Sequence, residues 1–355
     1  MNCKKAFPVV LAAAFLALNS FVQAQTATTD PVGFVTVSAA AGNGTDRTTS
    51  VISFPLVSPE TITGQVNGLI TGVTANSISN SSAGWSAGAL SVAATPYVIR
   101  ITSGAAKGYT FLISTSTANT ATTFTIDSEE AGQVDLSTLG IVTGASGDSY
   151  AIYGCDTLSS ALGTPATSGI QGGTSSAGTG ADIVQLFVAG SWRQYYYNTT
   201  SASWRRIGPN TISDNVPIRP DGAVIYSRLP ASALNLTVLG TVPTSNRKAL
   251  VNNSGVSFLS NSWPVNLTLG TSAIQSIPGW VSSATYNATT TDIVQMMVNG
   301  AWLKYYYTGT NWKRVGPNTL SDSVSILTGS ALIIQKAGSS IGASALAQTL
   351  PYSLL

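Results

Sequence analysis

The residues of this 355-residue chain that could do chemistry are few, because the sequence contains no histidine. Histidine is the commonest general base and the usual partner of a nucleophilic serine or cysteine. Two pairs of aspartates recur in matching surroundings, Asp182 with Asp292 and Asp214 with Asp322. A glycosidase needs two carboxylates that flank one scissile bond. These four aspartates instead open strands or lie in turns rich in Asn, Thr and Ser, so we predict structural roles and no catalysis.

A repeated group of aromatic and basic residues is the best candidate for a ligand-binding or interface surface. Tyr and Trp present a flat apolar face with a polar tip, which suits stacking against sugar rings or contact with another protein. Basic residues beside them could bind an acidic polysaccharide or stack on the rings. The candidate residues in the two copies are Trp192, Tyr196, Trp204 and Arg206, and Trp302, Tyr306, Trp312 and Arg314.

Core packing is the favoured interpretation of the same aromatic residues. Side chains alternate between the two faces of a strand, so consecutive tyrosines point to both faces. Aromatic pairs on adjacent antiparallel strands also stabilise a small sheet. At most one face is then left for binding, and basic pairs such as Arg205 and Arg206 are expected to form a solvated strand edge.

The segment that carries these residues occurs twice. Residues 182–197 read DIVQLFVAGSWRQYYY and residues 292–307 read DIVQMMVNGAWLKYYY, and WRRIGPNTISDNV from Trp204 is matched by WKRVGPNTLSDSV from Trp312. The Asn299-Gly300 pair between apolar runs, with Ala189-Gly190 in the first copy, is typical of a hairpin turn. We predict a three-stranded meander and a fourth strand in each copy, at 183–188, 191–197, 203–207 and 223–226, and at 293–298, 301–307, 311–315 and 331–334.

The chain before this repeat has its own strand signals, separated by turn-rich spacers, and no segment shows a sustained helical period with caps. We therefore predict an all-β fold of serial antiparallel β-sandwich or partly closed barrel-like units with an internal repeat. Leu162-Gly163-Thr164 and Leu269-Gly270-Thr271 mark the expected starts of the two copies. The predicted parts are a signal peptide at 1–24, an N-terminal β domain at 25–156, β repeat 1 at 157–248 and β repeat 2 at 249–355. The predicted strands of the N-terminal domain are 34–37, 51–56, 97–102, 109–113, 122–126 and 149–153.

The first 24 residues have the pattern of a secretory signal peptide. Two lysines precede an apolar run, and small residues stand where a signal peptidase cleaves, before Gln25. A membrane anchor needs about 20 apolar residues and this run is shorter, so no transmembrane span is expected in the mature chain. Removal of the segment leaves Cys155 as the single thiol, which excludes an intramolecular disulfide, and we expect this thiol to be buried.

The composition excludes several classes of function. Charged residues make up only 8% of the chain, with 16 basic against 14 acidic residues and no basic run. Nucleic-acid binding is not expected, because Lys and Arg would have to neutralise several phosphates. No phosphate-binding glycine loop or metal-ligand constellation occurs, and the adjacent Glu129 and Glu130 are expected to lie in a solvated turn, so we predict no cofactor.

Several motifs taken together resemble a known family. They are DPVGFVT at 30–36, SGAAKG at 103–108 followed by NTAT at 119–122, GDSY at 147–150, and the repeated Trp and Tyr unit. In this combination the chain resembles an uncharacterised family of exported, β-rich proteins found mainly in verrucomicrobial, Gram-negative genomes. The resemblance implies export and brings no activity, cofactor or catalytic residue with it.

These observations predict an exported, non-catalytic structural or adhesive protein of the cell envelope or the extracellular surface, with the periplasm as an alternative compartment. The expected partners are further copies of itself, other envelope proteins or a polysaccharide. A carbohydrate-binding protein that uses the repeated Trp and Tyr surface is the alternative. An outer-membrane barrel is less favoured, because the predicted strands are shorter than the roughly 9 to 11 residues that span a bilayer. An enzyme is the least favoured class.

Overall fold

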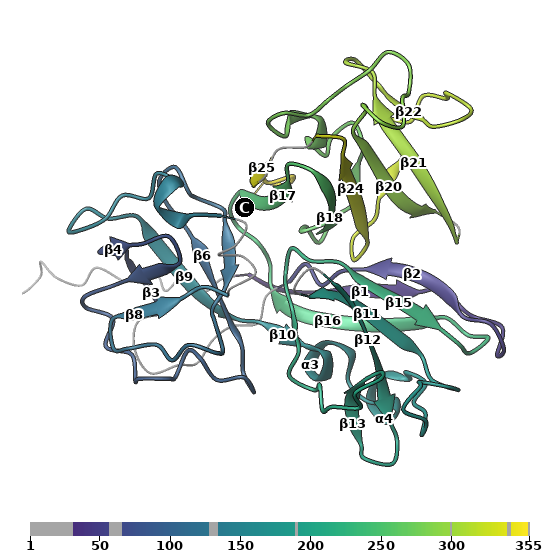
Figure 1. The fold of residues 1–355 in the computed structure, drawn as a ribbon, viewed down its shortest axis with the longest axis horizontal. Helices are drawn as coiled ribbons and strands as arrows, with labels where there is room; N and C mark the ends of the chain where they lie inside the picture. The colour runs from purple at the N-terminus through teal and green to yellow at the C-terminus, as the bar shows by residue number, and fades with distance from the viewer. Residues whose placement is uncertain are drawn as a thin grey trace, which may run out of the picture. The chain divides into compact units, whose positions relative to one another are not determined.

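The computed structural model describes residues 31–56, 66–127, 134–188, 191–298, 300–338 and 342–353. Within these ranges the chain is mostly β and forms several antiparallel sheets, none of which closes on itself (Figure 1). The predicted all-β class is therefore confirmed, and no closed barrel is present among the sheets described. The predicted signal peptide, the Glu129-Glu130 pair, Ala189-Gly190 and Asn299 lie outside the described residues.

The first five-stranded sheet contains the first copy of the repeated segment. Four of its five strands form the predicted meander and fourth strand, because the polar turns between apolar runs allow each strand of the meander to fold back on the last. The strand at one edge of the sheet, Thr48–Ile52, comes from far earlier in the chain. The order is β13 (Ser203–Arg206), β12 (Ser191–Asn198), β11 (Ile183–Val188), β15 (Val224–Arg228) and β2 (Thr48–Ile52).

The second five-stranded sheet contains the second copy of the repeated segment. Its strands follow the order of the first sheet: third, second, first and fourth strand of the copy, and then a strand from earlier in the chain. The cross-strand partners also correspond, since Tyr197 lies opposite Trp204 and Tyr307 opposite Trp312. The order is β22 (Trp312–Arg314), β21 (Ala301–Tyr307), β20 (Ile293–Val298), β24 (Ala331–Lys336) and β18 (Gly255–Ser260).

Two-stranded sheets accompany the larger ones. The two longest are the ribbon of β1 (Val32–Ala39) with β16 (Leu234–Thr241) and the ribbon of β17 (Arg247–Asn252) with β25 (Ala343–Gln348). Thus β1 and β2, predicted within the N-terminal domain, pair with strands from the predicted first repeat. The shorter sheets are β10 (Asp156–Thr157) with β14 (Pro217–Ile218) and β19 (Leu267–Thr268) with β23 (Ser325–Ile326).

Residues 66–154 form two further sheets around a core that includes Trp85, Phe124 and Tyr150. The strands of the four-stranded sheet are β3 (Asn67–Leu69), β9 (Ser149–Gly154), β6 (Tyr97–Ile101) and β7 (Thr110–Leu112). Those of the three-stranded sheet are β4 (Gly72–Val73), β5 (Ser77–Ser79) and β8 (Thr123–Thr125). The predicted strands at 97–102, 109–113, 122–126 and 149–153 are present with slightly different ends.

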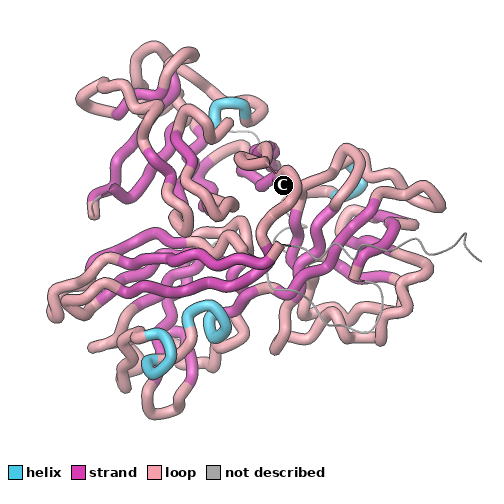
Figure 2. Tube along the Cα trace, turned by 180° about the vertical axis from the view of Figure 1, so that it is seen from behind, coloured by secondary structure: helices cyan, strands magenta, loops and turns pink. Residues whose placement is uncertain are grey.

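Helices are short (Figure 2). Among the described residues the α-helices are α3 (Leu158–Leu162) and α4 (Pro165–Ser168), and each begins with a capping box. These helices were not among the predicted elements, because a single turn has too few residues to show a helical period and depends on its caps. None of the helices within the described ranges is long and apolar enough to cross a membrane.

Each ribbon packs with a five-stranded sheet around one hydrophobic core. In the first, Val37 of β1 and Leu236 of β16 share a core with Trp204 and Tyr226. In the second, Val251 of β17 and Leu346 of β25 share a core with Trp312 and Ile334. The alternation of buried and exposed residues along β1 and β16 follows from the two-residue period of a strand.

The expected starts of the two copies need a correction. The backbone N–H groups of Leu269 and Gly270 donate to the carbonyl oxygens of Val324 and Asp322. The corresponding bonds in the first copy come from Leu158 and Ser159, which donate to Val216 and Asp214. Leu158 therefore corresponds to Leu269, and the likeness of Leu162-Gly163-Thr164 to Leu269-Gly270-Thr271 is one of local sequence only.

Candidate functional site

The two tyrosines and two later tryptophans predicted as site residues are buried. The exposed fraction is 0% for Tyr196, 1% for Tyr306, 1% for Trp204 and 0% for Trp312. The strands β12 and β21 have exposed residues in their first half, near the hairpin turn, and buried residues in their second half. These four rings lie in the second half or directly opposite it, so they do not form an exposed binding platform.

The two buried tryptophans have different polar surroundings. The indole N–H of Trp204 donates to the carbonyl oxygen of Gly163 at 3.0 Å. The Trp312 ring lies edge-on to Trp280, with 5.7 Å between the ring centroids, and its N–H has no acceptor among the described residues. The hydroxyls of Tyr196 and Tyr306 donate to the side-chain oxygens of turn asparagines. These contacts are internal and give the rings a structural role.

Trp192 and Trp302, near the hairpin turns, are the predicted aromatic residues that reach the surface. Their exposed fractions are 37% and 39%. Trp192 packs edge-on against Phe258, with centroids 4.5 Å apart, and against Phe187 at 5.4 Å. Trp302 lies opposite Met297 in the strand register. Of the predicted aromatic set, these two rings are therefore the ones that a ligand could reach.

The predicted basic residues lie opposite buried tyrosines. Arg206 is half-buried and pairs with Tyr195, and Arg314 is exposed and pairs with Tyr305. Burial raises the pKa of both tyrosine hydroxyls above the ordinary value, and the charge of the facing arginine opposes this rise. Arg206 and Arg314 are the last residues of β13 and β22, so each ends the third strand of its meander beside a buried tyrosine.

The carboxylate of Asp182 is buried and has a full set of hydrogen-bond donors. Its Oδ2 accepts from the Tyr226 hydroxyl at 2.7 Å, from Arg228 Nη1 at 2.7 Å and from the Gln171 backbone N–H at 2.8 Å. Its Oδ1 accepts from the backbone N–H of Leu229 at 2.8 Å. Such bonds compensate for the burial of a charge.

Asp292 has nearly the same set of partners in the second copy. Its Oδ2 accepts from Lys336 Nζ at 2.7 Å and from the Val281 N–H at 2.8 Å, and its Oδ1 accepts from the Ala337 N–H at 2.7 Å. The Arg228 and Lys336 side chains each also donate to a glycine carbonyl, of Gly169 and Gly279 respectively. The sequence shows a basic residue at the end of each fourth strand, but the pairing with aspartate becomes visible only in the fold.

Asp214 and Asp322 also have matching roles. Their Oδ1 atoms accept from the backbone N–H groups of Trp204, at 2.8 Å, and Trp312, at 3.0 Å. Both aspartates thereby hold the turn that follows the third strand of the meander. Their position in turns agrees with the expectation from the sequence.

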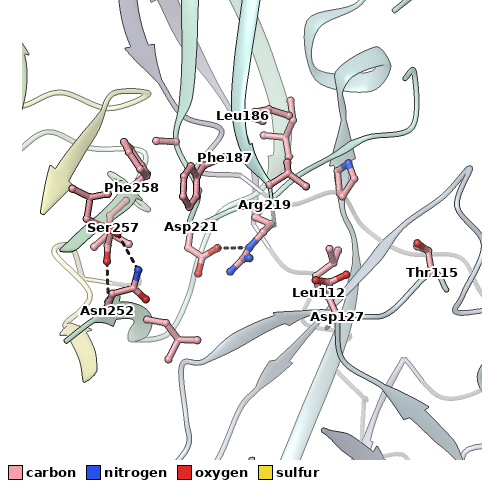
Figure 3. A pocket seen from close by; sticks show the side chains of 18 residues that line it. Leu112, Thr115, Asp127, Leu186, Phe187, Arg219, Asp221, Asn252, Ser257 and Phe258 are labelled. Carbon is pink, nitrogen blue, oxygen red and sulfur yellow. Dashed lines mark hydrogen bonds and ion pairs between the residues drawn. The ribbon is translucent and has the colours of Figure 1, made fainter. Parts of the chain in front are cut away.

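A pocket of about 270 Å³ has a mixed apolar and polar lining that includes Phe187, Phe258, Arg219 and Asp221 (Figure 3). Arg219 Nε lies 3.8 Å from Asp221 Oδ1, so these opposite charges lie beside each other.

The buried Cys155 thiol donates to a backbone carbonyl, which agrees with its predicted packing role. Within the described residues no group of three or more His, Cys, Asp or Glu side chains is placed to hold a metal ion.

Sequence reasoning missed an exposed apolar surface on the ribbon of β1 and β16. Val32, Phe34 and Leu239 are 74%, 70% and 69% exposed, and Phe34 lies directly opposite Leu239. We call the outward side of this ribbon the outer ribbon face, formed by Val32, Phe34, Thr36 and Ser38 of β1 and by Asn235, Thr237 and Leu239 of β16. The alternation in the sequence could have revealed it, but only once both strands were known to be paired.

Comparisons of the chain with protein-family models, with curated proteins and with solved structures found no match.

Proposed function

We propose that this chain is an exported, non-catalytic structural or adhesive protein of the cell envelope or the outer cell surface. The observation that carries the proposal is the outer ribbon face, which exposes three large apolar side chains and no charge. Contiguous exposed apolar surface is typical of a contact site. The non-catalytic part of the proposal is supported by the burial and hydrogen bonding of Asp182, because these contacts give this candidate catalytic carboxylate a role in stability.

Export is proposed from the signal-peptide pattern at residues 1–24 and from the resemblance to the exported verrucomicrobial family. It is tested by fractionating cells that express the full-length chain. We expect the protein in the envelope fraction or the culture medium, with an N-terminus near Gln25. Recovery from the cytoplasm with an intact N-terminus would contradict the proposal.

The proposal includes an architecture of two copies of one β unit. The first unit comprises β1, β2 and β10–β16, and the second comprises β17–β25. The equal strand order, the matching aspartate contacts and the two ribbons support this division. In this arrangement residues 66–154 are a domain inserted into the first unit, between β2 and β10.

The structural or adhesive role is tested with a strain that lacks the protein. We expect weaker attachment of these cells to one another or to a surface, restored by the native chain. A chain with Phe34→Asp should restore attachment less well, whereas Leu320→Asp, which changes an equally exposed residue elsewhere, should restore it fully. Unchanged attachment in the deletion strain, together with an intact envelope, would contradict the role.

Carbohydrate binding through Trp192 and Trp302 is the second candidate, favoured by the exposure of these two rings. It is tested by measuring retention of the protein on a panel of insoluble polysaccharides. We expect Trp302→Ala to reduce retention, and Val256→Ala, at a residue with 38% exposure, to leave it unchanged. Absence of retention on every polysaccharide would remove this candidate.

A further inference from the structure

The outer ribbon face combines apolar and neutral polar residues in regular register. Phe34 lies opposite Leu239 and Thr36 opposite Thr237, while Ser38 Oγ donates to Asn235 Oδ1 at 2.6 Å. The inward residues of the same two strands belong to a hydrophobic core, so the ribbon is anchored on one side and open on the other. This arrangement exposes a mixed surface of apolar and neutral polar side chains, with its large apolar side chains at Val32, Phe34 and Leu239.

Neither strand of this ribbon contains a charged residue. The strands read VGFVTVSA and LNLTVLGT. Long, uncharged strands at the surface are unusual, because charged side chains normally prevent unwanted association between sheets. A surface without charge can meet an identical surface without burying like charges, which is the requirement of a two-fold symmetric interface.

The corresponding ribbon of the second unit is covered by the chain itself. Leu250 of β17 and Ala345 of β25, which point outward, pack against the hydrophobic core of residues 66–154. The backbone N–H of Lys248 donates to Gly108 O at 2.9 Å, and Lys248 Nζ lies 5.2 Å from the centroid of the Tyr109 ring. A β domain thus covers this face in the second unit, whereas the same face of the first unit is exposed.

We infer that the outer ribbon face binds the same face of a second copy of this chain, giving a two-fold symmetric dimer. The inference rests on the proposed structural role and names the partner of the proposed contact site. The single 66–154 domain of each chain already covers β17 and β25, so it does not supply the missing cover. In the dimer Phe34 and Leu239 of one copy pack against the same pair of the other, as in sheet-on-sheet packing.

The dimer is tested by light scattering coupled to size-exclusion chromatography over a concentration series of the purified, exported protein. We expect a concentration-dependent dimer in the native chain. Leu239→Asp should raise the dissociation constant at least about thirtyfold, the effect of losing a central apolar contact. Leu320→Asp is the matched control, because Leu320 is also 69% exposed but lies outside the ribbon, and it should leave the constant unchanged.

Three outcomes would overturn the inference. The first is a native chain that stays monomeric at every concentration. The second is a dimer that both Leu239→Asp and Phe34→Asp leave intact, which would place the contact elsewhere. The third is equal weakening by Leu239→Asp and Leu320→Asp. If the native chain is monomeric but still restores cell attachment, the dimer is excluded and the proposed function stands. If the native chain neither dimerises nor restores attachment, both proposals are excluded.

Discussion

At the scale of single residues, the most informative groups are the buried aspartates. Asp182 and Asp292 lie at the same place in the two sheets, and each joins the start of one strand to the end of another through a basic residue and backbone amides. A buried ion pair is not a strong source of stability by itself. Loss of one partner is costly, however, because the remaining charge stays buried without compensation.

The first prediction concerns Asp292→Asn. We expect the free energy of unfolding to fall by about 3 kcal/mol, because Lys336 would keep a buried charge without its carboxylate. The measurement is chemical denaturation followed by tryptophan fluorescence. The double variant Asp292→Asn with Lys336→Met should recover part of the loss. A double variant less stable than the single one would show that the lysine charge is not the cause.

The second prediction concerns the alkaline stability of the fold. Burial, followed by the nearby charge of Asp182, raises the pKa of the Tyr226 hydroxyl above its ordinary value of about 10. Above pH 10 the unfolded chain loses this proton while the folded chain keeps it, so stability falls as the pH rises. Tyr226→Phe should reduce this dependence by about 1.4 kcal/mol per pH unit between pH 10.5 and 11.5, measured by denaturation. An equal dependence of the free energy of unfolding on pH in the native chain and in Tyr226→Phe would contradict the prediction.

At the scale of elements, the hairpins show why strand positions are easier to predict than exposure. The alternation of apolar runs with polar turns located the strands of both meanders within one or two residues. It did not show that the first half of β12 and β21 is exposed and the second half buried. That difference depends on which neighbouring strands cover each half.

The third prediction concerns the turn after β22. Asn318 has a φ of 56°, in the left-handed region, and its side chain accepts a hydrogen bond from the Tyr306 hydroxyl at 2.8 Å. Asn318→Gly keeps the backbone conformation and loses the bond, so we expect a loss of about 1 kcal/mol. Asn318→Ala loses the bond and adds strain, so we expect about 2 kcal/mol or more. The midpoints of chemical denaturation give the stabilities of Asn318→Gly and Asn318→Ala. Equal stability of these two variants would show that the left-handed backbone conformation at position 318 adds no strain to Asn318→Ala.

At the scale of the whole molecule, long-range pairing defines the units. β1 and β2 leave their sequence neighbours and pair with β16 and β15. β17 and β18 pair with β25 and β24, which lie in the same continuous stretch of chain. The strand pairs of the proposed second unit therefore lie in one continuous stretch of chain, whereas those of the proposed first unit lie on both sides of residues 66–154.

The fourth prediction follows from this pairing. A fragment of residues 243–353 keeps every strand pair from β17 to β25, so we expect it to fold and unfold cooperatively on heating. A fragment of residues 157–248 lacks β1 and β2 and leaves Leu236 and Val238 without the β1 residues that lie opposite them, so it should be insoluble or unfolded. Circular dichroism and the dispersion of amide NMR signals distinguish the two. A well-folded 157–248 fragment would contradict the division into units.

The sequence by itself determined the local features of this protein. Strand positions, turn residues and the absence of a histidine-based site follow from residue types and short spacings, which depend on neighbours within a few positions. The repeated segment also identified Asp182, Trp192 and their counterparts as matching residues. It favoured core packing for the aromatic residues as a group, but it could not separate the buried Tyr196 from the exposed Trp192, because both lie on β12 and the two-residue period places them on the same face.

Only the tertiary structure decided which strands meet. It joined β1 to β16 across more than half of the chain, placed Arg228 and Lys336 on the buried aspartates, and brought Phe34 opposite Leu239 on one exposed face. Pairing between distant strands depends on the sum of many burial and hydrogen-bond terms, and no short pattern encodes that sum. For the same reason, the contact surface proposed here became visible only when two strands nearly 200 residues apart were seen side by side.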